Sequence, residues 1–230
     1  DHACEALIVE TLRKQRPADA VLAEEGGGVD RPGAAWRWII DPLDGTTNYA
    51  HSFPVFSVSA ALERAGRVVL GFVYDPMREE MFMASAGRGA FLNGAAIRVS
   101  GVADLGASLL ATGFPYDLRT SPVNNLAHWG RFIVRAQAIR RCGSAALDLS
   151  YVACGRFDGF WELKLKPWDV AAGALIVAEA GGRVSDFRGA DFALETPGIL
   201  ATNGRIHQEM LEVLAKDGIA GGADGSDDRT

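Results

Sequence analysis

The sequence lacks the features that mark membrane, secreted and disulfide-bonded proteins. No apolar run reaches the roughly 18 residues of a bilayer span, since the longest uncharged stretch, residues 45–62, holds several polar residues and a proline. The start shows no basic segment followed by an apolar one, so no secretory signal is visible. Only three cysteines occur, without a CxxC pair, and we expect them to be buried, reduced thiols. These absences predict a cytoplasmic protein without membrane contact.

The sequence also lacks an excess of positive charge. It has 23 Lys and Arg residues against 29 Asp and Glu residues, which gives a formal net charge of −6. This balance argues against a nucleic-acid coat or an anionic membrane surface as the main partner. Hydrophobic residues make up 48% of the 230 residues and charged residues 23%, which is ordinary for a chain with a buried core.

The first half of the chain predicts one helix followed by strands. Apolar residues at helical spacing predict a helix over 5–12, and aromatic and β-branched residues predict strands over 21–23 and 36–40. The second strand should stop at Pro42, because proline cannot donate to a ladder. From residue 55 to residue 93, strand-like runs alternate with turn signals, which is typical of an antiparallel meander.

The second half alternates strands with helices. Strands are predicted over 108–112, 159–165, 182–187 and 198–201, and helices over 144–153, 169–180 and 206–215. Residues 115–128 give no clear pattern. A meander followed by this alternation predicts stacked layers of sheet and helix in a single domain, residues 1–215, and the glycine-rich remainder, 216–230, is predicted to be a disordered tail.

Two carboxylates, Asp41 and Asp44, lie three residues apart after a predicted buried strand. With the carbonyl of Leu43 they offer hard oxygen ligands, which suit Mg²⁺ or Mn²⁺ better than zinc. An isolated pair of this kind is more often an Asx turn that caps the chain. The next residues, Gly45 and Thr46, could open a helical turn whose free N–H groups attract phosphate, and this favours a ligand site.

Three further carboxylates have both an ordinary and a functional interpretation. Asp169 begins a predicted helix and by itself would be an ordinary N-cap. Glu162 lies on a predicted strand, where an inward side chain would bury its charge unless it faces a ligand. Glu24 follows a predicted strand, and alone it is equally well a solvated loop residue.

Together these segments resemble the inositol monophosphatase family of Mg²⁺-dependent, lithium-sensitive phosphatases. The resemblance covers nearly the whole chain apart from the tail, and two separate family signatures occur in the expected order. It is carried by Glu24-Glu25, residues 38–49, Gly143-Ser144-Ala145, Glu162, Trp168-Asp169 and Ala172-Gly173. The fold implied by this resemblance is mixed α/β (α+β), a layered αβαβα sandwich with a meander sheet, a second mixed sheet, and helices between and outside them.

The resemblance implies a metal site and a mechanism. Two or three Mg²⁺ ions are implied, with Mn²⁺ as a substitute and Li⁺ and Ca²⁺ as inhibitors. Glu24 and Thr46 would position and deprotonate a metal-activated water, which attacks phosphorus directly. Asp41 would bridge two ions. The implied metal ligands are Glu24, Asp41, the Leu43 carbonyl, Asp44 and Asp169.

The same resemblance implies hydrolysis of myo-inositol 1-phosphate, or a related sugar or polyol phosphate, by a homodimer. The implied substrate contacts are Gly45, Thr46, Gly143, Ser144, Ala145, Glu162 and Asp169. Family members usually carry two helices before the position of Asp1, including a mobile loop with a lysine that helps to organise the site. The N-terminal helices of the family are therefore expected to be missing from this chain.

Several other functions stay open on the sequence. Within the same superfamily they are fructose-1,6-bisphosphatase, histidinol phosphatase and nucleotide 3′-phosphatase. A regulatory protein-binding role in transcription or RNA processing belongs to a different class, and the acidic net charge makes nucleic acid itself a poor candidate partner. The simplest alternative is a structural domain that binds metal without turnover.

Overall fold

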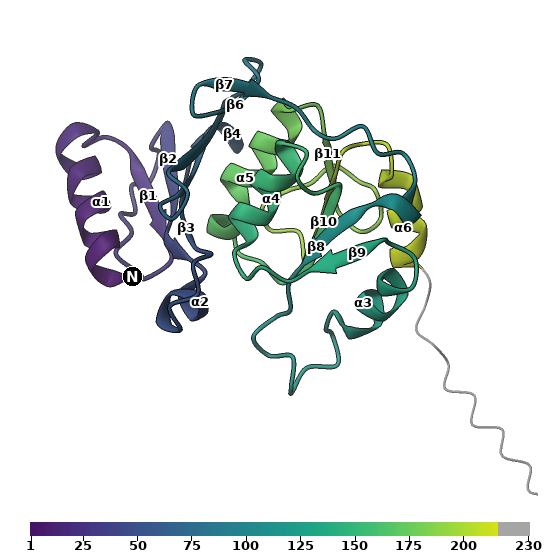
Figure 1. Ribbon diagram of the computed structural model, residues 1–230. Coiled ribbons are helices and arrows are strands. Elements are labelled where there is room, and N and C mark those ends of the chain that lie inside the picture. Colours follow the sequence, from purple (N-terminus) through teal and green to yellow (C-terminus); the bar gives the residue numbers. More distant parts are fainter. Residues whose placement is uncertain (216–230) are drawn as a thin grey trace, which may run out of the picture.

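The computed structural model describes residues 1–215 and arranges them in five layers (Figure 1). From one side to the other the layers are α1 (His2–Gln15), a seven-stranded sheet, the pair α4 (Ala145–Ala153) and α5 (Pro167–Glu179), a five-stranded sheet, and the pair α3 (Leu126–Ile133) and α6 (His207–Ala215). The expected αβαβα sandwich is confirmed. The prediction of a disordered tail falls on residues 216–230, outside the described residues.

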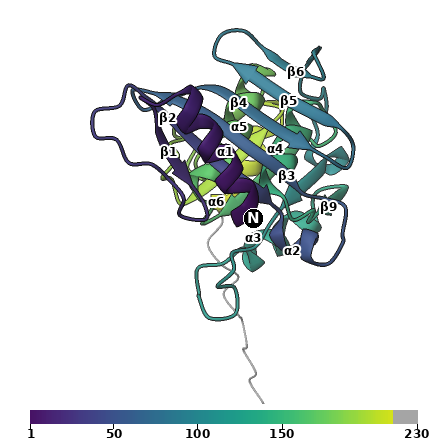
Figure 2. The ribbon, with the colours of Figure 1, turned by 90° about the vertical axis from the view of Figure 1, so that its left-hand side faces the viewer.

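The seven-stranded sheet keeps its strands in chain order, and α1 lies across its outer face (Figure 2). Its strands are β1 (Ala20–Ala23), β2 (Trp36–Asp44), β3 (Ser57–Arg64), β4 (Arg67–Asp75), β5 (Glu80–Ser85), β6 (Ala90–Leu92) and β7 (Ala95–Ile97). Neighbours are antiparallel except β1 and β2, which are parallel. The predicted meander is confirmed, with a turn at Asn93 and Gly94, both at positive φ, joining β6 to β7.

The predicted strand end at Pro42 is wrong. β2 continues to Asp44, and its ladder with β3 shifts register between Asp41 and Asp44. Pro42 and Leu43 therefore stand opposite a single residue of β3, in a bulge. Within the bulge, residue 42 does not need to donate a hydrogen bond to the ladder. The strand can therefore contain a proline at this position. Both aspartates thus stay on the sheet, one on each side of the bulge.

The five-stranded sheet is mixed, as expected. Its strands are β8 (Leu109–Thr112), β9 (Ala138–Arg140), β10 (Gly159–Leu163), β11 (Arg183–Ser185) and β12 (Gly198–Thr202), in the order β11-β12-β10-β8-β9. β10 pairs parallel with β8 and antiparallel with β12. Two short elements, α2 (Thr46–Ala50) and a 3₁₀ turn η1 (Leu105–Ala107), complete the described chain. No helix within residues 1–215 is long and apolar enough to cross a membrane.

The expectation for the cysteines is only partly right. All three are free thiols, as predicted, and Cys142 and Cys154 are half-buried. Cys4 is exposed, contrary to the prediction. The reason is its position on α1, which covers the sheet from outside and buries only the face that carries Glu5 and Val9.

The central helices α4 and α5 pack closely because a glycine lies at their contact. A Cβ atom added to Gly173 would lie 2.6 Å from the Cβ atom of Leu149, which is fully buried. On the other side of α5, a Cβ atom on Gly71 of β4 would lie 2.9 Å from the carbonyl oxygen of Ala172. The spacing between the sheet and the helix pair thus depends on residues without side chains.

We expect Gly173→Ala to lower the free energy of unfolding by about 1–3 kcal/mol, because the added methyl group has no space in this packed core. Gly130→Ala in α3 is the matched control. A Cβ atom there meets nothing within 4 Å, so alanine should raise stability by up to about 1 kcal/mol. Urea unfolding measures both. Equal losses in the two variants would show that packing against Leu149 is not the cause.

Candidate active site

Two carboxylates meet because β1 ends beside β2, its parallel neighbour, where the bulge of β2 begins. In the ladder of β1 with β2, Ala23 lies opposite Ile40 and forms the last pair. The residues that follow them, Glu24 and Asp41, are therefore neighbours across the two chains. The N–H group of Glu24 donates to the carbonyl of Ile40 at 3.3 Å. The sheet register therefore places Glu24 beside the acidic bulge of β2.

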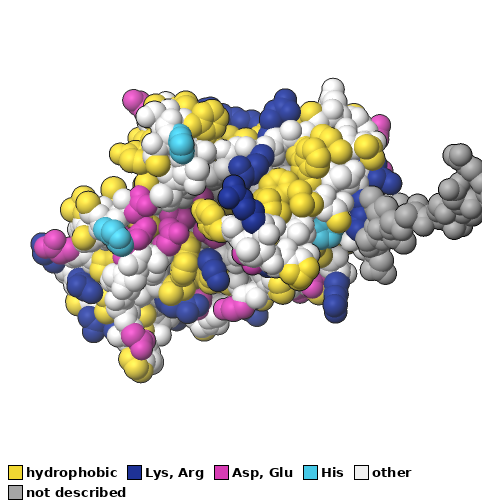
Figure 3. All heavy atoms as spheres, turned by 90° about the horizontal axis from the view of Figure 1, so that it is seen from below, with side chains coloured by type: hydrophobic (Ala, Val, Ile, Leu, Met, Phe, Trp, Pro, Cys, Tyr) yellow, Lys and Arg dark blue, Asp and Glu magenta, His cyan; other side chains and the backbone are white. Residues whose placement is uncertain are grey.

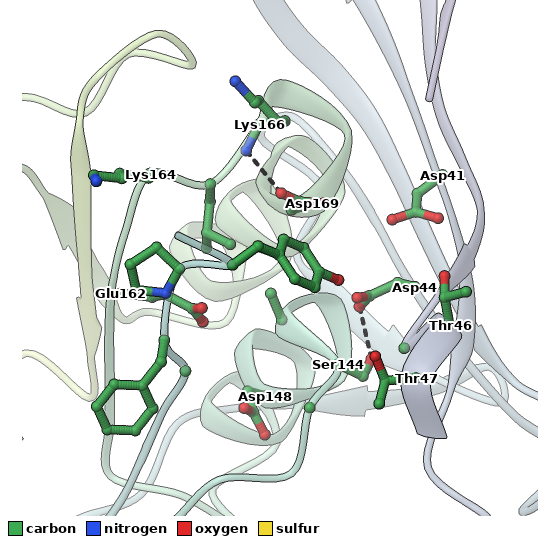
Figure 4. A pocket seen from close by; sticks show the side chains of 18 of the residues that line it. Asp41, Asp44, Thr46, Thr47, Ser144, Asp148, Glu162, Lys164, Lys166 and Asp169 are labelled. Atoms are coloured by element: carbon green, nitrogen blue, oxygen red, sulfur yellow. Dashed lines mark hydrogen bonds between the residues drawn. The ribbon is translucent and has the colours of Figure 1, made fainter. Parts of the chain in front are cut away.

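A cavity of about 560 Å³ adjoins this strand end, and every predicted site residue lines it. Figure 3 shows acidic side chains gathered in a hollow on this face, with Lys and Arg side chains near it. In Figure 4 the side chains of Asp41, Asp44 and Thr46 approach the cavity from β2 and α2, and those of Asp148, Glu162 and Asp169 lie across from them on α4, β10 and α5. The residues brought together are Glu24, Asp41, Leu43, Asp44, Gly45, Thr46, Gly143, Ser144, Ala145, Glu162 and Asp169.

Asp44 is held by the first turn of α4. Its Oδ2 atom accepts hydrogen bonds from the hydroxyl of Ser144 at 2.6 Å and from the N–H group of Ala146 at 2.8 Å. Ser144 is also the predicted N-cap of α4, because its oxygen accepts from the N–H group of Leu147. Burial nevertheless raises the pKa of Asp44 to about 6. The helix start thus orients the aspartate without fully compensating its desolvation.

Asp41 is a strongly perturbed carboxyl of the site. Its Oδ1 atom accepts from the N–H group of Leu43 at 2.9 Å, which is the Asx turn that the sequence allowed. Burial raises the pKa of Asp41 to about 10, and the charges of Asp44, Glu24 and Asp169 add to the effect. Burial also raises the pKa of Glu24, although a hydrogen bond to Asp41 lowers it in part. Burial thus disfavours the charged forms of both carboxyl groups.

Asp169 is the third residue of α5 and not its N-cap. The helix begins at Pro167, because proline suits the first helical position, and Asp169 reaches back to accept from the N–H group of Lys166 at 2.7 Å. Burial raises the pKa of Asp169 to about 7. The carboxylate lies at the N-terminus of α5 and faces the cavity (Figure 4).

Gly45 lets the chain turn from β2 into α2. Its φ of 100° is left-handed, and a Cβ atom there would lie 3.2 Å from the carbonyl oxygen of Gly143. The helical turn predicted after it is confirmed, since α2 begins at Thr46. The hydroxyl of Thr46 donates to the carbonyl of Leu43 at 3.2 Å. The first N–H groups of α2 have no partner within the helix and lie at the cavity.

Sequence reasoning missed two residues at the site. The side-chain amide of Asn48 donates to the carbonyls of Val55 at 2.7 Å and Cys142 at 2.8 Å, so it ties α2 to the segment before α4. Asp148 lies in α4 and lines the cavity near Glu162. A charged residue within an otherwise apolar helix was the available signal for Asp148. The contacts of Asn48 span distant segments and leave no local pattern.

The donor set fits a hard divalent cation. Glu24, Asp41, Asp44 and Asp169 are all carboxylates, and their crowded charges raise one another's pKa values. A divalent cation would remove that repulsion, and oxygen ligands of this type suit Mg²⁺. Within residues 1–215, no group of three Asp, Glu, His or Cys side chains is already arranged to hold a metal ion. Binding would therefore require these side chains to rotate toward one another.

The chain is similar to several known proteins. A sequence profile of the inositol monophosphatase family matches residues 1–218. An inositol-1-monophosphatase of Synechocystis is 48% identical over 94% of this chain and 75% of its own length. A Nus factor SuhB of Pseudomonas aeruginosa is 49% identical over 93% of this chain and 80% of its own length. The solved inositol monophosphatase of Anabaena superposes with a TM-score of 0.90 at 46% identity, over 93% of this chain and 85% of that one.

Proposed function

The chain belongs to the inositol monophosphatase family, and we propose that it is a Mg²⁺-dependent phosphomonoesterase that hydrolyses myo-inositol 1-phosphate, or a related polyol phosphate, to the polyol and phosphate. Family membership supports phosphatase activity on small phosphate esters. The structural observation that supports the proposal is that four carboxylates and the N-terminus of α2 line one cavity. Those carboxylates are Glu24, Asp41, Asp44 and Asp169.

In the proposed reaction, these carboxylates and the Leu43 carbonyl would hold the cations. Bound Mg²⁺ would supply a more acidic water and neutralise charge on the phosphate. Glu24 and the hydroxyl of Thr46 would orient the attacking water, and Glu24 would accept its proton, for which a raised pKa is suited. The N–H groups of Gly45 and Thr46 would bind phosphate oxygens as the N-terminus of a helix does. Mn²⁺ is the expected substitute, and Li⁺ and Ca²⁺ are the expected inhibitors.

The opposite wall of the cavity is proposed to bind the alcohol part of the substrate. Gly143, Ser144 and Ala145 precede or begin α4, and Glu162 faces them from β10. Glu162 is only 8% exposed, and Gly113 leaves it room, because any Cβ atom at Gly113 would overlap its carboxylate. A buried carboxylate that accepts from hydroxyl groups would prefer a polyol phosphate to a plain alkyl phosphate.

We further propose that the protein forms a homodimer through α3. Leu126, Trp129 and Ile133 share one side of this helix and are 54%, 38% and 40% exposed, although they are large and apolar. Figure 3 shows hydrophobic side chains gathered beside the hollow on the part of the molecule where α3 lies. Sedimentation equilibrium of the purified protein tests this, and a monomer mass would contradict it.

A panel of phosphate esters tests the proposed activity. We expect release of phosphate from myo-inositol 1-phosphate with Mg²⁺, its inhibition by Li⁺, and smaller kcat/KM values for fructose 1,6-bisphosphate, histidinol phosphate and a nucleoside 3′-phosphate. A larger value for one of these would move the assignment to that activity within the superfamily. Absence of hydrolysis of every ester, with Mg²⁺ still raising the melting temperature, would favour a structural metal-binding domain.

A second candidate function is regulation of transcription by binding another protein. It is favoured by the similarity to the Nus factor SuhB of Pseudomonas aeruginosa. Purification of tagged protein from cells tests it. A stable complex with transcription proteins together with negligible phosphatase activity would make this the main function.

A further inference from the structure

A second pair of acidic residues lies in the cavity, on the side away from Asp41 (Figure 4). Asp148 is on α4 and Glu162 is on β10, and both line the cavity although they are only 2% and 8% exposed. Neither residue belongs to the proposed metal site. Two carboxylates that are nearly removed from water are costly unless something donates hydrogen bonds to them.

The Oδ1 atom of Asp148 has no hydrogen-bond partner. Among the side chains of residues 1–215, only two other buried nitrogen or oxygen atoms share this property, one in Arg37 and one in His128. The thiol of Cys142 contacts Asp148, but a thiol is a weak donor and leaves Oδ1 unsatisfied. A buried acceptor that is left unpaired destabilises the folded protein. A ligand that donates to this oxygen would recover that loss.

The surroundings of the pair favour a neutral donor over a cation. Arg141 lines the same cavity and its charge lowers the pKa of Glu162 in part, while its guanidinium lies 5.7 Å from the ring centre of Phe114. Burial raises the pKa of both carboxyl groups, and the charge of Asp148 adds to the shift of Glu162. Both side chains offer acceptor oxygens, and a protonated carboxyl would add an O–H donor. Hydroxyl groups, which both donate and accept, match such a pair.

We propose that Asp148 is a substrate-specificity residue, which binds a hydroxyl group of the polyol together with Glu162. This rests on the proposed phosphatase function and extends it, since the family resemblance implies Glu162 but not Asp148. The N–H groups at the start of α2 would bind the phosphate end of the substrate, and this pair would bind hydroxyl groups at the other end. A site built to bind a hydroxyl rejects analogues that lack it, because its buried polar atoms are then unpaired.

The test compares two substrates in the Asp148→Asn variant. With Mg²⁺ present, kcat/KM for myo-inositol 1-phosphate should fall about 10–100-fold, and kcat/KM for phenyl phosphate, which has no ring hydroxyl, should fall less than about 3-fold. Asp158→Asn is the matched control. Asp158 is also buried, but it accepts hydrogen bonds from the hydroxyl of Ser100 and from the N–H group of Leu109, outside the cavity. Its replacement should affect both substrates equally.

Deoxy analogues of inositol phosphate give a second measurement that does not depend on the variant's folding. For the unchanged protein, kcat/KM should be lower for one deoxy analogue than for myo-inositol 1-phosphate. The factor should equal the loss of kcat/KM that Asp148→Asn causes on myo-inositol 1-phosphate. The variant should lose nothing further on that analogue, because the two changes remove the same hydrogen bond. Equal losses on both substrates, or independent losses on every analogue, would overturn the role of Asp148 alone. No hydrolysis of any ester by the unchanged protein would overturn the proposed function as well.

Discussion

Asp41→Asn is expected to lower kcat/KM for a polyol phosphate by about 10³-fold or more, the scale seen when a principal electrostatic group of an active site is removed. Asp41 is buried near the charges of Glu24, Asp44 and Asp169, where its carboxylate would help to hold the cations. An amide has the same shape but no charge, so it is a much weaker ligand for Mg²⁺. The measurement is phosphate release over a Mg²⁺ titration, in which the variant should also need more Mg²⁺ for half-maximal activity.

The same variant should keep its fold, and this separates catalysis from stability. The pKa of Asp41 is raised to about 10, so its carboxyl is already neutral in the metal-free protein at pH 7, and an amide changes little. In EDTA the variant should therefore melt within a few degrees of the unchanged protein.

Asp75→Asn is the control for the opposite result, a loss of stability without a loss of catalysis. Asp75 is equally buried, but it pairs with Arg78 at 3.0 Å and accepts from the backbone of Met77, outside the cavity. This variant should lose stability and keep its kcat/KM per folded molecule. An Asp41→Asn protein that melts much lower in EDTA, or that retains activity, would contradict the assignment of Asp41.

Most of the fold was predictable because its elements carry local signals. The meander is marked by short turns such as Asn93-Gly94, and α4 by Ser144 before an apolar run. α3 was missed, although Leu126, Trp129 and Ile133 repeat at helical spacing, because their apolar side faces outward and an irregular segment precedes the helix. The error at Pro42 has a different cause, since a bulge removes the need for the donor that proline lacks.

The site was predictable where one segment holds several of its groups. Asp41, Asp44 and Gly45 belong to a single stretch, so residue types and spacing alone suggested oxygen ligands beside a helical turn. The cavity wall beyond them could not be predicted in this way. Asp148 and Glu162 line the same cavity only because α4 packs against β10. A local sequence pattern also does not show that the Oδ1 atom of Asp148 lacks a hydrogen-bond partner.

Removal of metal is expected to abolish phosphate release and to reverse the pH dependence of stability. The carboxyls of Asp44 and Asp169 have pKa values raised to about 6 and about 7, against about 4 in an unfolded chain. Between these values the folded protein binds more protons than the unfolded chain, so its stability falls as the pH rises from about 4 through 7. Mg²⁺ binds the deprotonated carboxylates, and its stabilisation therefore grows over the same range.

Thermal unfolding from pH 5 to pH 8, in EDTA and in excess Mg²⁺, measures this effect. At 100 times its dissociation constant, an ion adds about 2.7 kcal/mol, or roughly 5–10 °C in the melting temperature. His207 contributes equally with and without Mg²⁺. Burial lowers its pKa to about 4, so the unfolded chain binds a proton there more readily, and stability is lost as the pH falls below about 6.5. The difference between the two series thus isolates the acidic cluster. A difference that stays constant or shrinks toward pH 8 would mean that Mg²⁺ does not bind these carboxylates.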